Sequence, residues 1–239
     1  MPPADAPTDP GPAAQAGPDA EDTLDLRLTA ELLALLGEET PAYGYGPADS
    51  ALLDRPARWK PVTTSAGVFQ LVPVRLERDL ALISRWMNDP AVADFWELAG
   101  AETVTAAHLM PQLDGDGRSI PCLGVLSGVP MSYWEIYRAD LDPLSRHCRV
   151  RPHDTGIHLL IGDVRGRGHG IGSTLLRAVS DLVLDSRPRC TRVVAEPDLR
   201  NTPSVSAFLR AGFRYSAEVE LPEKRAALMV RDRAHRDHL

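Results

Sequence analysis

The stretch that decides the fold reads Asp163-Val-Arg-Gly-Arg-Gly-His-Gly-Ile-Gly172. Its glycines carry no Cβ, so the backbone can approach a ligand closely. A strand is predicted just before it, at residues 156–161, and apolar residues recur at helical spacing after it, from Ile171 to Val183. Free N–H groups at the start of that helix lie at its positive end, where an anion such as a pyrophosphate is stabilised.

Spacing argues against two other phosphate-binding motifs. A Walker loop requires a lysine followed by Ser or Thr, and no lysine lies near residues 163–172. A dinucleotide fingerprint requires a third glycine where Ile171 and Ser173 stand. A flexible surface turn is the plainer alternative, but the strand before the glycines and the helix after them favour a ligand-binding turn.

Working outward from the turn, periodicity and turn signals predict an α/β fold. The order of elements gives a mixed central sheet of about seven strands, with antiparallel strands first and a crossover helix inserted late. Asn88-Asp-Pro90 ends the first helix. The expected strands are 68–74, 122–126, 130–137, 156–161, 191–195, 213–219 and 225–230, and the expected helices are 79–87, 104–113, 171–183 and a helix from Thr202 to Gly212.

The segments outside this domain carry weaker signals. Residues 1–22 are dominated by Pro, Ala, Gly and Asp and are expected to be a disordered tail. Residues 23–66 are read as an extension, with a short amphipathic helix at 24–36 and an irregular part at 41–64 that packs through Tyr43, Tyr45 and Trp59. The main domain is residues 67–239. Within it, the irregular stretch 139–152 is a candidate binding loop.

Composition limits the classes of partner. The net charge of −7 disfavours nucleic acid and anionic membranes and suits a small cationic substrate. Three cysteines without a CxxC pair, no apolar run of membrane-spanning length and no signal-peptide pattern lead us to expect a cytoplasmic protein. The histidines show no metal-ligand spacing, so no metal is inferred. A monomer or a homodimer is expected.

Arg167-x-x-Gly170-x-Gly172, followed by Ser-Thr-Leu-Leu, resembles the coenzyme A motif of the GNAT superfamily of acyltransferases. The resemblance runs from about Val68 to Val230 and implies the GNAT fold, with acetyl-CoA or another acyl-CoA as co-substrate. Phe208 stands where many members place the tyrosine that protonates the leaving thiolate, so another acid or water must do so. The implied coenzyme contacts are Ile161, Arg165, Gly166, Arg167, Gly168, His169, Gly170, Ile171, Gly172, Ser173, Thr174, Asn201 and Phe208.

Four further segments are similar to siderophore-biosynthesis acyltransferases, which acylate the hydroxylated side-chain nitrogen of lysine, ornithine or cadaverine to give a hydroxamate. They are residues 85–97, 133–137, 156–158 and 196–202, and they keep their relative order. By position, the resemblance makes His158 the candidate general base or substrate-orienting group. Asp198 is its partner or a second polar anchor. An N-alkylhydroxylamine is mostly neutral at physiological pH, so a modest base such as histidine suffices.

Each of these residues also has a plainer interpretation. His158 reads equally as a hydrogen-bonded core histidine, and Asp198 as a turn or capping residue. Tryptophans line cores as well as pockets, so core packing is the simpler account for each of them. On the functional interpretation, the tryptophans wall a groove for the methylene chain and the glutamates hold a distal ammonium. The substrate-side candidates are Trp86, Asn88, Trp96, Glu97, Trp134 and Glu135.

Two other functions remain open from the sequence. Aminoglycoside N-acetyltransferases share the coenzyme turn and a similar end of the first helix, although His158 stands where they usually carry an aspartate. A non-catalytic acyl-CoA-binding module is the second alternative, motivated by Phe208. For the enzyme, we expect direct attack of the nitrogen on the thioester without a covalent intermediate, since no cysteine has a nucleophile setting. The resemblance implies that a backbone N–H near Leu160 or Ile161 polarises the carbonyl.

Overall fold

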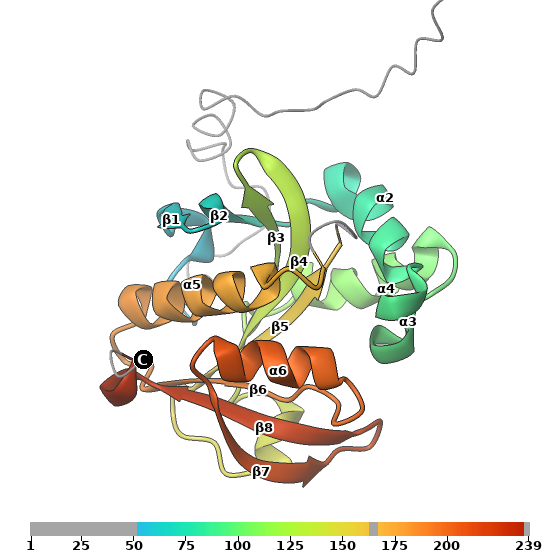
Figure 1. Ribbon diagram of the computed structural model, residues 1–239. Coiled ribbons are helices and arrows are strands. Elements are labelled where there is room, and N and C mark those ends of the chain that lie inside the picture. Colours follow the sequence, from blue (N-terminus) through green and yellow to red (C-terminus); the bar gives the residue numbers. More distant parts are fainter. Residues whose placement is uncertain (1–51, 163–166, 237–239) are drawn as a thin grey trace, which may run out of the picture.

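The structure, a computed structural model, describes residues 52–162 and 167–236. Its strands are β1 (Val62–Thr64), β2 (Gly67–Pro73), β3 (Ser119–Leu126), β4 (Val129–Arg138), β5 (Thr155–Ile161), β6 (Arg192–Ala195), β7 (Arg214–Glu220) and β8 (Arg225–Asp232). They form one mixed sheet in the order β1-β2-β3-β4-β5-β6-β8-β7 (Figure 1). Within the described chain, β5 and β6 pair in parallel and the other neighbouring strands pair antiparallel.

The seven predicted strands are present, and the eighth is β1. Residues 62–64 belong to a segment that the sequence predicts to be irregular, so that expectation is corrected here. The strand forms because a tight turn folds it back on β2: Gly67 takes a φ of +130°, and the Thr64 hydroxyl donates to the Gly67 carbonyl at 2.7 Å. Three residues are too few to show the alternation by which strands are recognised.

The helices are α2 (Leu76–Met87), α3 (Pro90–Trp96), α4 (Glu102–Leu113), α5 (Ile171–Ser186) and α6 (Thr202–Arg210), with 3₁₀ turns at η2 (Pro56–Arg58), η3 (Pro143–Arg146) and η5 (Arg233–His235). α2 ends before Asn88, as predicted, but α3 was not expected. It starts because the Asp89 side chain accepts from the Ala91 N–H at 3.0 Å and Pro90 holds the first helical position.

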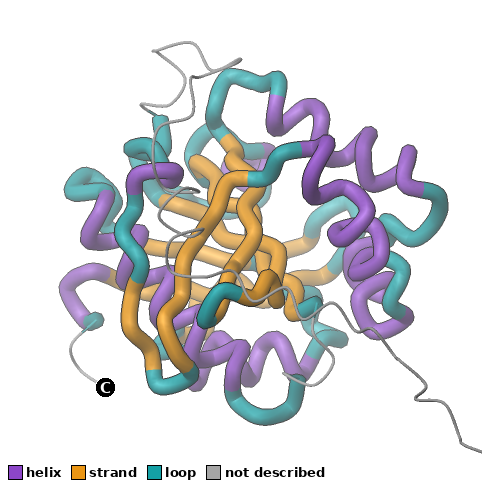
Figure 2. Tube along the Cα trace, turned by 90° about the horizontal axis from the view of Figure 1, so that it is seen from above, coloured by secondary structure: helices purple, strands orange, loops and turns teal. Residues whose placement is uncertain are grey.

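Helices cover both faces of the sheet, as Figures 1 and 2 show from two directions. On one face, α5 buries the predicted apolar stripe, including Leu175, Val179 and Val183, in the same core cluster as Trp134 and Ile136 of β4. On the other face, α2 and α4 bury apolar residues against the alternate residues of β3 and β4. The predicted helix after the glycine turn is therefore the main support of one core.

β5 and β6 separate at their carboxyl ends. Their pairing consists of Thr155 with Val193 and Gly156 with Val194, and no pairing follows beyond Gly156. His158 to Ile161 therefore border a gap in the sheet. Gaps at the carboxyl ends of parallel strands are where α/β proteins bind ligands. Because Gly162, just after β5, donates its N–H to the Met131 carbonyl of β4, the alternation of the backbone directs the Ile161 N–H toward the gap.

The described part of the N-terminal extension packs onto the domain. Leu53 and Trp59 are buried in the main core. The buried Arg187 donates to the Leu52 carbonyl at 2.8 Å and to Asp54 at 3.0 Å. The predicted tail 1–22, the helix 24–36 and the residues Tyr43 and Tyr45 lie outside the described residues. Within the described ranges, no helix combines the length and apolarity needed to cross a membrane.

Candidate active site

The glycine turn leads directly into α5. Residues 167–170 form the turn, and Gly168 and Gly170 have φ values of +76° and +80°, a backbone conformation that favours glycine. A Cβ at either position would meet no atom within 4 Å, so the space beside the turn is open. Gly170 precedes Ile171, the first residue of α5, whose free N–H groups are directed to this open side. Arg165 and Gly166 lie outside the described residues.

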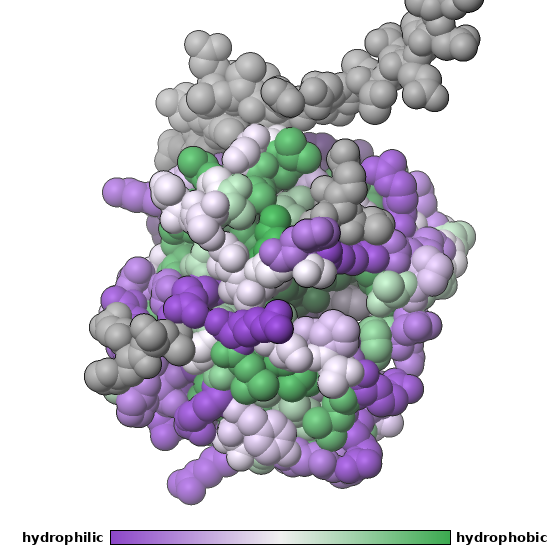
Figure 3. Space-filling model, in the orientation of Figure 1, coloured by the Kyte–Doolittle hydropathy of each residue, from purple (hydrophilic) through white to green (hydrophobic). Residues whose placement is uncertain are grey.

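A cleft of about 900 Å³ runs along the turn. Figure 3 shows a hollow near the centre of the face that carries α5 and α6, next to apolar surface. The cleft lies between the carboxyl end of β5 on one side and the start of α6 on the other. Eight of the predicted coenzyme contacts line it: Ile161, Arg167, Gly168, Gly170, Ile171, Gly172, Ser173 and Asn201.

The other described coenzyme candidates lie beside this cleft. His169 is exposed, and its Nδ1 donates to the Arg167 carbonyl at 2.7 Å. The Thr174 hydroxyl donates to the Gly170 carbonyl at 3.3 Å, which stabilises the first turn of α5. Phe208 is buried, stacks edge-on against Phe213 and borders a second cavity. It has no acidic group, so it cannot protonate a thiolate.

The Arg167 side chain is held by two groups of the protein. Its Nε donates to the Ile161 carbonyl at 2.9 Å, and its guanidinium pairs with Asp89 at 2.9 Å. The hydrogen bond from Arg167 lowers the pKa of Asp89, which also caps α3. Arg167 therefore fixes the turn against α3 and β5, and the backbone N–H groups are the part of the turn left for an anion.

A smaller cavity of about 220 Å³ adjoins the cleft. The two share five lining residues, so they lie side by side at the gap between β5 and β6, and we call them together the groove. The shared residues are Phe95, Trp96, Leu159, Asn201 and Ser204. The walls of the small cavity also carry His108, Glu135, His158, Glu196, Asp198 and Lys224. Most of the ionisable groups along the groove therefore lie at this end.

His158 lies between two buried carboxylates. Its Nδ1 is 2.7 Å from Glu135, and its Nε2 forms a short hydrogen bond to Glu196. A carboxylate only accepts hydrogen bonds from a histidine, so both ring nitrogens must carry protons and His158 is an imidazolium cation. Burial alone would lower the pKa of His158, but the charges of Glu196 and Glu135 and their hydrogen bonds outweigh it and raise that pKa to about 10.

Both carboxylates are held as anions. Glu135 accepts from His108 at 2.6 Å, from Gln112 at 2.8 Å and from the Tyr133 hydroxyl at 2.9 Å. Burial would raise its pKa, yet these donors and His158 hold it well below the ordinary range. Burial opposes ionisation of Glu196 as well, but His158 lowers the pKa of Glu196 to about 2. The three groups, which we call the Glu135–His158–Glu196 cluster, carry a net charge of −1.

Tyr137 and Gly156 complete the support of Glu196. The Tyr137 hydroxyl donates to Glu196 at 2.7 Å, and its ring packs against the His158 ring with centroids 4.8 Å apart. Gly156 faces Tyr137 across the β4–β5 pair, and a Cβ there would lie 1.9 to 2.3 Å from ring atoms of Tyr137. Residue 156 must therefore be a glycine, because any side chain there would collide with the Tyr137 ring that orients Glu196.

The partner of His158 differs from the sequence expectation. Asp198 is buried beside the cavity, but its carboxylate accepts from the Arg200 side chain at 2.7 Å and from the Arg200 backbone N–H at 2.7 Å. Glu196 and Glu135 take the place expected for Asp198 because β6 and β4 flank β5. Glu196 lies within the quoted segment 196–202, but no signal in that segment assigns it a role. The contacts of His158 with Glu135 and Glu196 depend on how three segments of the chain lie side by side in the sheet, which the sequence alone does not give.

The substrate-side candidates separate into two groups. Trp96 and Glu135 border the small cavity, with the Trp96 ring edge-on to His158 at 6.1 Å. Trp134 and Trp86 are buried in the two cores, so the simpler packing interpretation replaces the proposed groove for these two. Asn88 exchanges two hydrogen bonds with the Gly100 backbone, and Glu97 ends α3 with a φ of +55°. These four residues border none of the cavities described.

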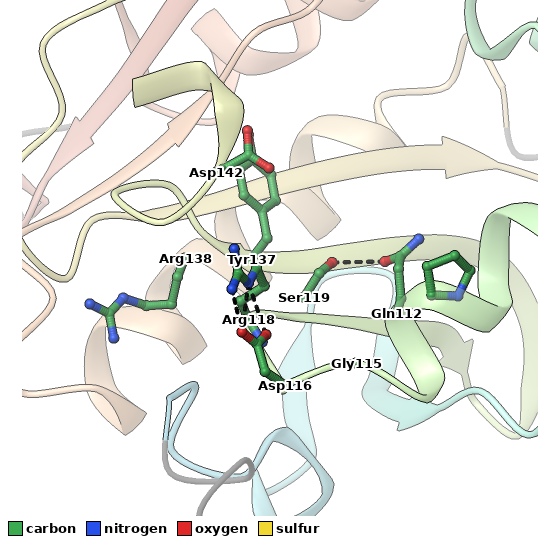
Figure 4. A pocket seen from close by; sticks show the side chains of 10 residues that line it. Gln112, Gly115, Asp116, Arg118, Ser119, Tyr137, Arg138 and Asp142 are labelled. Atoms are coloured by element: carbon green, nitrogen blue, oxygen red, sulfur yellow. Dashed lines mark hydrogen bonds and ion pairs between the residues drawn. The ribbon is translucent and has the colours of Figure 1, made fainter. Parts of the chain in front are cut away.

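A third cavity of about 430 Å³ lies on the far side of Tyr137 and Gln112 (Figure 4). Figure 4 shows Arg118 directed at Asp116 and the Ser119 hydroxyl donating to Gln112 at 2.7 Å. Arg138 is paired with Asp140. Asp142 is the residue by which the predicted binding loop 139–152 reaches this cavity. The cavity borders the back of the Glu135–His158–Glu196 cluster, and its arginines are already neutralised by neighbouring aspartates.

Comparison with known proteins identifies the family. The model of the acetyltransferase (GNAT) domain matches residues 75–221. N(6)-hydroxylysine O-acetyltransferase from Escherichia coli is 37% identical over 157 residues, which are 66% of this chain and 50% of that protein. This chain thus spans half the length of that relative. Lysine N-acyltransferase MbtK from Mycobacterium sp. (strain MCS) is 34% identical over 177 residues, which are 74% of this chain and 72% of that protein.

A solved structure shares the fold. An uncharacterized protein from Bacillus halodurans superposes with a TM-score of 0.69 at 32% identity, covering 73% of this chain and 90% of that one. The residues matched by the family model include the gap between β5 and β6 and the glycine turn before α5. The chain belongs to the GNAT acetyltransferase family and is an acyltransferase.

Proposed function

We propose that this enzyme transfers an acyl group from acyl-CoA to the hydroxylamine nitrogen of a hydroxylated amino acid or diamine, forming a hydroxamate for siderophore biosynthesis. The observation that carries the proposal is the groove, in which a cleft along a glycine turn suited to a pyrophosphate adjoins a small cavity with an anionic cluster. The relatives named for hydroxylysine and lysine acylation support the choice of acceptor.

The donor is assigned to the larger cleft. The N–H groups of the turn and of the start of α5 bind the pyrophosphate, because they are free donors at the positive end of a helix. The pantetheine arm extends past Asn201 toward the gap in the sheet. The thioester carbonyl accepts from the Ile161 N–H, which the alternation of β5 directs into the gap.

The acceptor is assigned to the smaller cavity. A neutral hydroxylamine attacks the thioester carbon directly, and positive charge develops on its nitrogen as the N–C bond forms. The Glu135–His158–Glu196 cluster, with its net negative charge, stabilises that charge. Glu196 receives the proton and the C–S bond breaks, after which the proton reaches the thiolate to give free coenzyme thiol. The resemblance implies that His158 is either the general base or an orienting group, and a protonated His158 takes the orienting role, toward Glu196.

The test is a thiol-release assay that crosses acetyl-CoA and succinyl-CoA with hydroxylysine, hydroxyornithine, hydroxycadaverine and an aminoglycoside. We expect turnover with at least one hydroxylamine and none with the aminoglycoside. Glu196→Gln should lower kcat/KM about 100-fold, the scale of a lost proton acceptor. Glu223→Gln, an exposed glutamate of the nearby β7–β8 turn, is the matched control and should leave kcat/KM unchanged. Turnover confined to the aminoglycoside would overturn the proposal.

A further inference from the structure

Lys224 is an unusual residue in this chain. Only two of the 26 basic residues are lysines, Lys60 and Lys224, and the other cationic positions are arginines. Lys224 is half-buried in the turn between β7 and β8 and borders the small cavity. Two backbone hydrogen bonds exchanged with Leu221, at 2.9 and 3.3 Å, close that turn and fix the position of the residue.

The charges around Lys224 are already paired with other groups. Glu196 is bound by His158 and Tyr137, and Asp198 is bound by Arg200. The next residue, Arg225, pairs with Glu218 and Glu220. Among the residues that the structure describes, Lys224 forms no ion pair of its own. A half-buried cation on a cavity wall, near carboxylates that already have other partners and without an ion pair to any of them, favours an anionic group on the ligand.

The position of Lys224 favours a contact with the acceptor substrate over a contact with acyl-CoA. It borders the small cavity, together with His158 and Glu196, and is absent from the walls of the cleft along the glycine turn. Burial raises the pKa of Glu196, and the charges of His158 and Lys224 lower it. The pKa of the neighbouring Asp198 is lowered first by hydrogen bonds from Arg200, and the charge of Lys224 lowers it further. Lys224 therefore lies close to the cluster, within the space in which the second substrate must fit.

We propose that Lys224 binds the carboxylate of the acceptor, so that the enzyme acylates a hydroxylated amino acid in preference to a hydroxylated diamine. This inference rests on the proposed function. A hydroxylated lysine or ornithine carries a hydroxylamine at one end of a short methylene chain and a carboxylate at the other. With the nitrogen at the Glu135–His158–Glu196 cluster, the carboxylate pairs with the ammonium of Lys224. A hydroxylated diamine has no group for this ammonium.

The experiment measures kcat and KM for hydroxylysine and for hydroxycadaverine at saturating acetyl-CoA. Lys224→Met keeps the length of the side chain and removes its charge. We expect it to raise the KM for hydroxylysine about 10- to 100-fold, the effect of one charge-assisted hydrogen bond, with little change in kcat. The KM for hydroxycadaverine should stay within about twofold. Lys224→Arg should restore most of the affinity, and Lys60→Met, at an exposed site, is the control.

The outcomes separate this inference from the proposed function. Equal rises in KM for both acceptors would overturn the inference, as would a rise in the KM for acetyl-CoA or a preference of the wild-type enzyme for hydroxycadaverine. No turnover of any hydroxylamine by the wild-type enzyme would instead overturn the proposed function, and this inference with it. Calorimetric binding of hydroxylysine to wild type and Lys224→Met, with the thermal midpoint of each, distinguishes lost recognition from misfolding.

Discussion

His158 holds a proton on each ring nitrogen because each nitrogen meets a carboxylate. Histidines that act as bases need one nitrogen free of protons near neutral pH. The negative charges of Glu135 and Glu196 remove that possibility here and convert the residue into a cation that holds two anions in place. The proton acceptor that we assign is then Glu196, which borders the small cavity.

We predict that His158 stays protonated in the wild-type protein up to about pH 10. Glu196→Gln removes one of the two negative charges, so the pKa of His158 should fall by at least about one unit. The measurement is an NMR titration of the histidine ring signals, with His158 assigned by its absence in His158→Gln. A wild-type His158 that titrates near pH 6.5 would contradict this description of the cluster.

The site could be predicted from the sequence only in part. The segments around His158 and Glu135 identified these two residues as site candidates, and the glycine turn identified where acyl-CoA binds. The pairing of His158 with Glu196 was not predicted, because it joins residues 38 positions apart whose distance depends on how β5 and β6 lie in the sheet. The sequence left open whether each tryptophan lines the groove or packs in a core, and the structure buries Trp86 and Trp134 in the cores and places Trp96 at the small cavity. Which face of β4 carries Trp134 and which carries Glu135 follows from the packing of α5 and α4.

At the scale of elements, the register of β4 with β5 builds the site. Glu135 pairs with His158 in that register, and Tyr137 pairs with Gly156. These positions place the rings of His158 and Tyr137 on the same face of the sheet, since side chains alternate along a strand. The absence of a Cβ at Gly156 gives Tyr137 room to reach across β5 to Glu196, which follows β6.

We predict that Gly156→Ala displaces the Tyr137 ring, because the new methyl would lie about 2 Å from its carbons. Overpacking of this kind costs roughly 1–3 kcal/mol in the free energy of unfolding, and the loss of the Tyr137 hydrogen bond should lower kcat/KM as well. Urea unfolding and the thiol-release assay measure the two effects. Tyr137→Phe is the matched variant: it should lower kcat/KM with a smaller loss of stability. Unchanged activity in both variants would show that Tyr137 does not orient Glu196.

Elements with strong periodicity were predictable, and short elements were not. The apolar stripe of α5 and the strands of the sheet are long enough to show their repeat of 3.6 or 2 residues. β1 and α3 have three and seven residues and depend on local contacts, namely the turn at Gly67 and the cap at Asp89. α3 matters for function because it carries Trp96 to the edge of His158.

At the scale of the molecule, the Glu135–His158–Glu196 cluster joins β4, β5 and β6 with α4, which contributes His108 and Gln112. It bridges the strands on either side of the gap, where backbone hydrogen bonds are missing. The same ion pairs that prepare the site therefore also stabilise the fold. This dual role makes the stability of the whole chain depend on pH through these groups.

The sign of that dependence follows from the direction of each shift. The pKa of Glu196 is lowered to about 2, so its contribution is present above its ordinary value of 4.5 and is lost as the pH falls toward 2. The pKa of His158 is raised to about 10, so its contribution is present below 6.5 and is lost as the pH rises through 10. The cluster contributes its full stability between about pH 4.5 and 6.5.

We predict that the free energy of unfolding of the wild-type protein declines from pH 6.5 to pH 9 through His158, and that His158→Gln lacks this component. At pH 6 the variant should be less stable by roughly 1.5–3 kcal/mol, the range for a hydrogen bond to a charged group. It should then gain stability as the pH falls, because two facing carboxylates without a cation favour protonation of one. Urea unfolding at a series of pH values measures this, with the exposed His147→Gln as control. Parallel curves for wild type and His158→Gln from pH 6.5 to 9 would refute the coupling of the cluster to global stability.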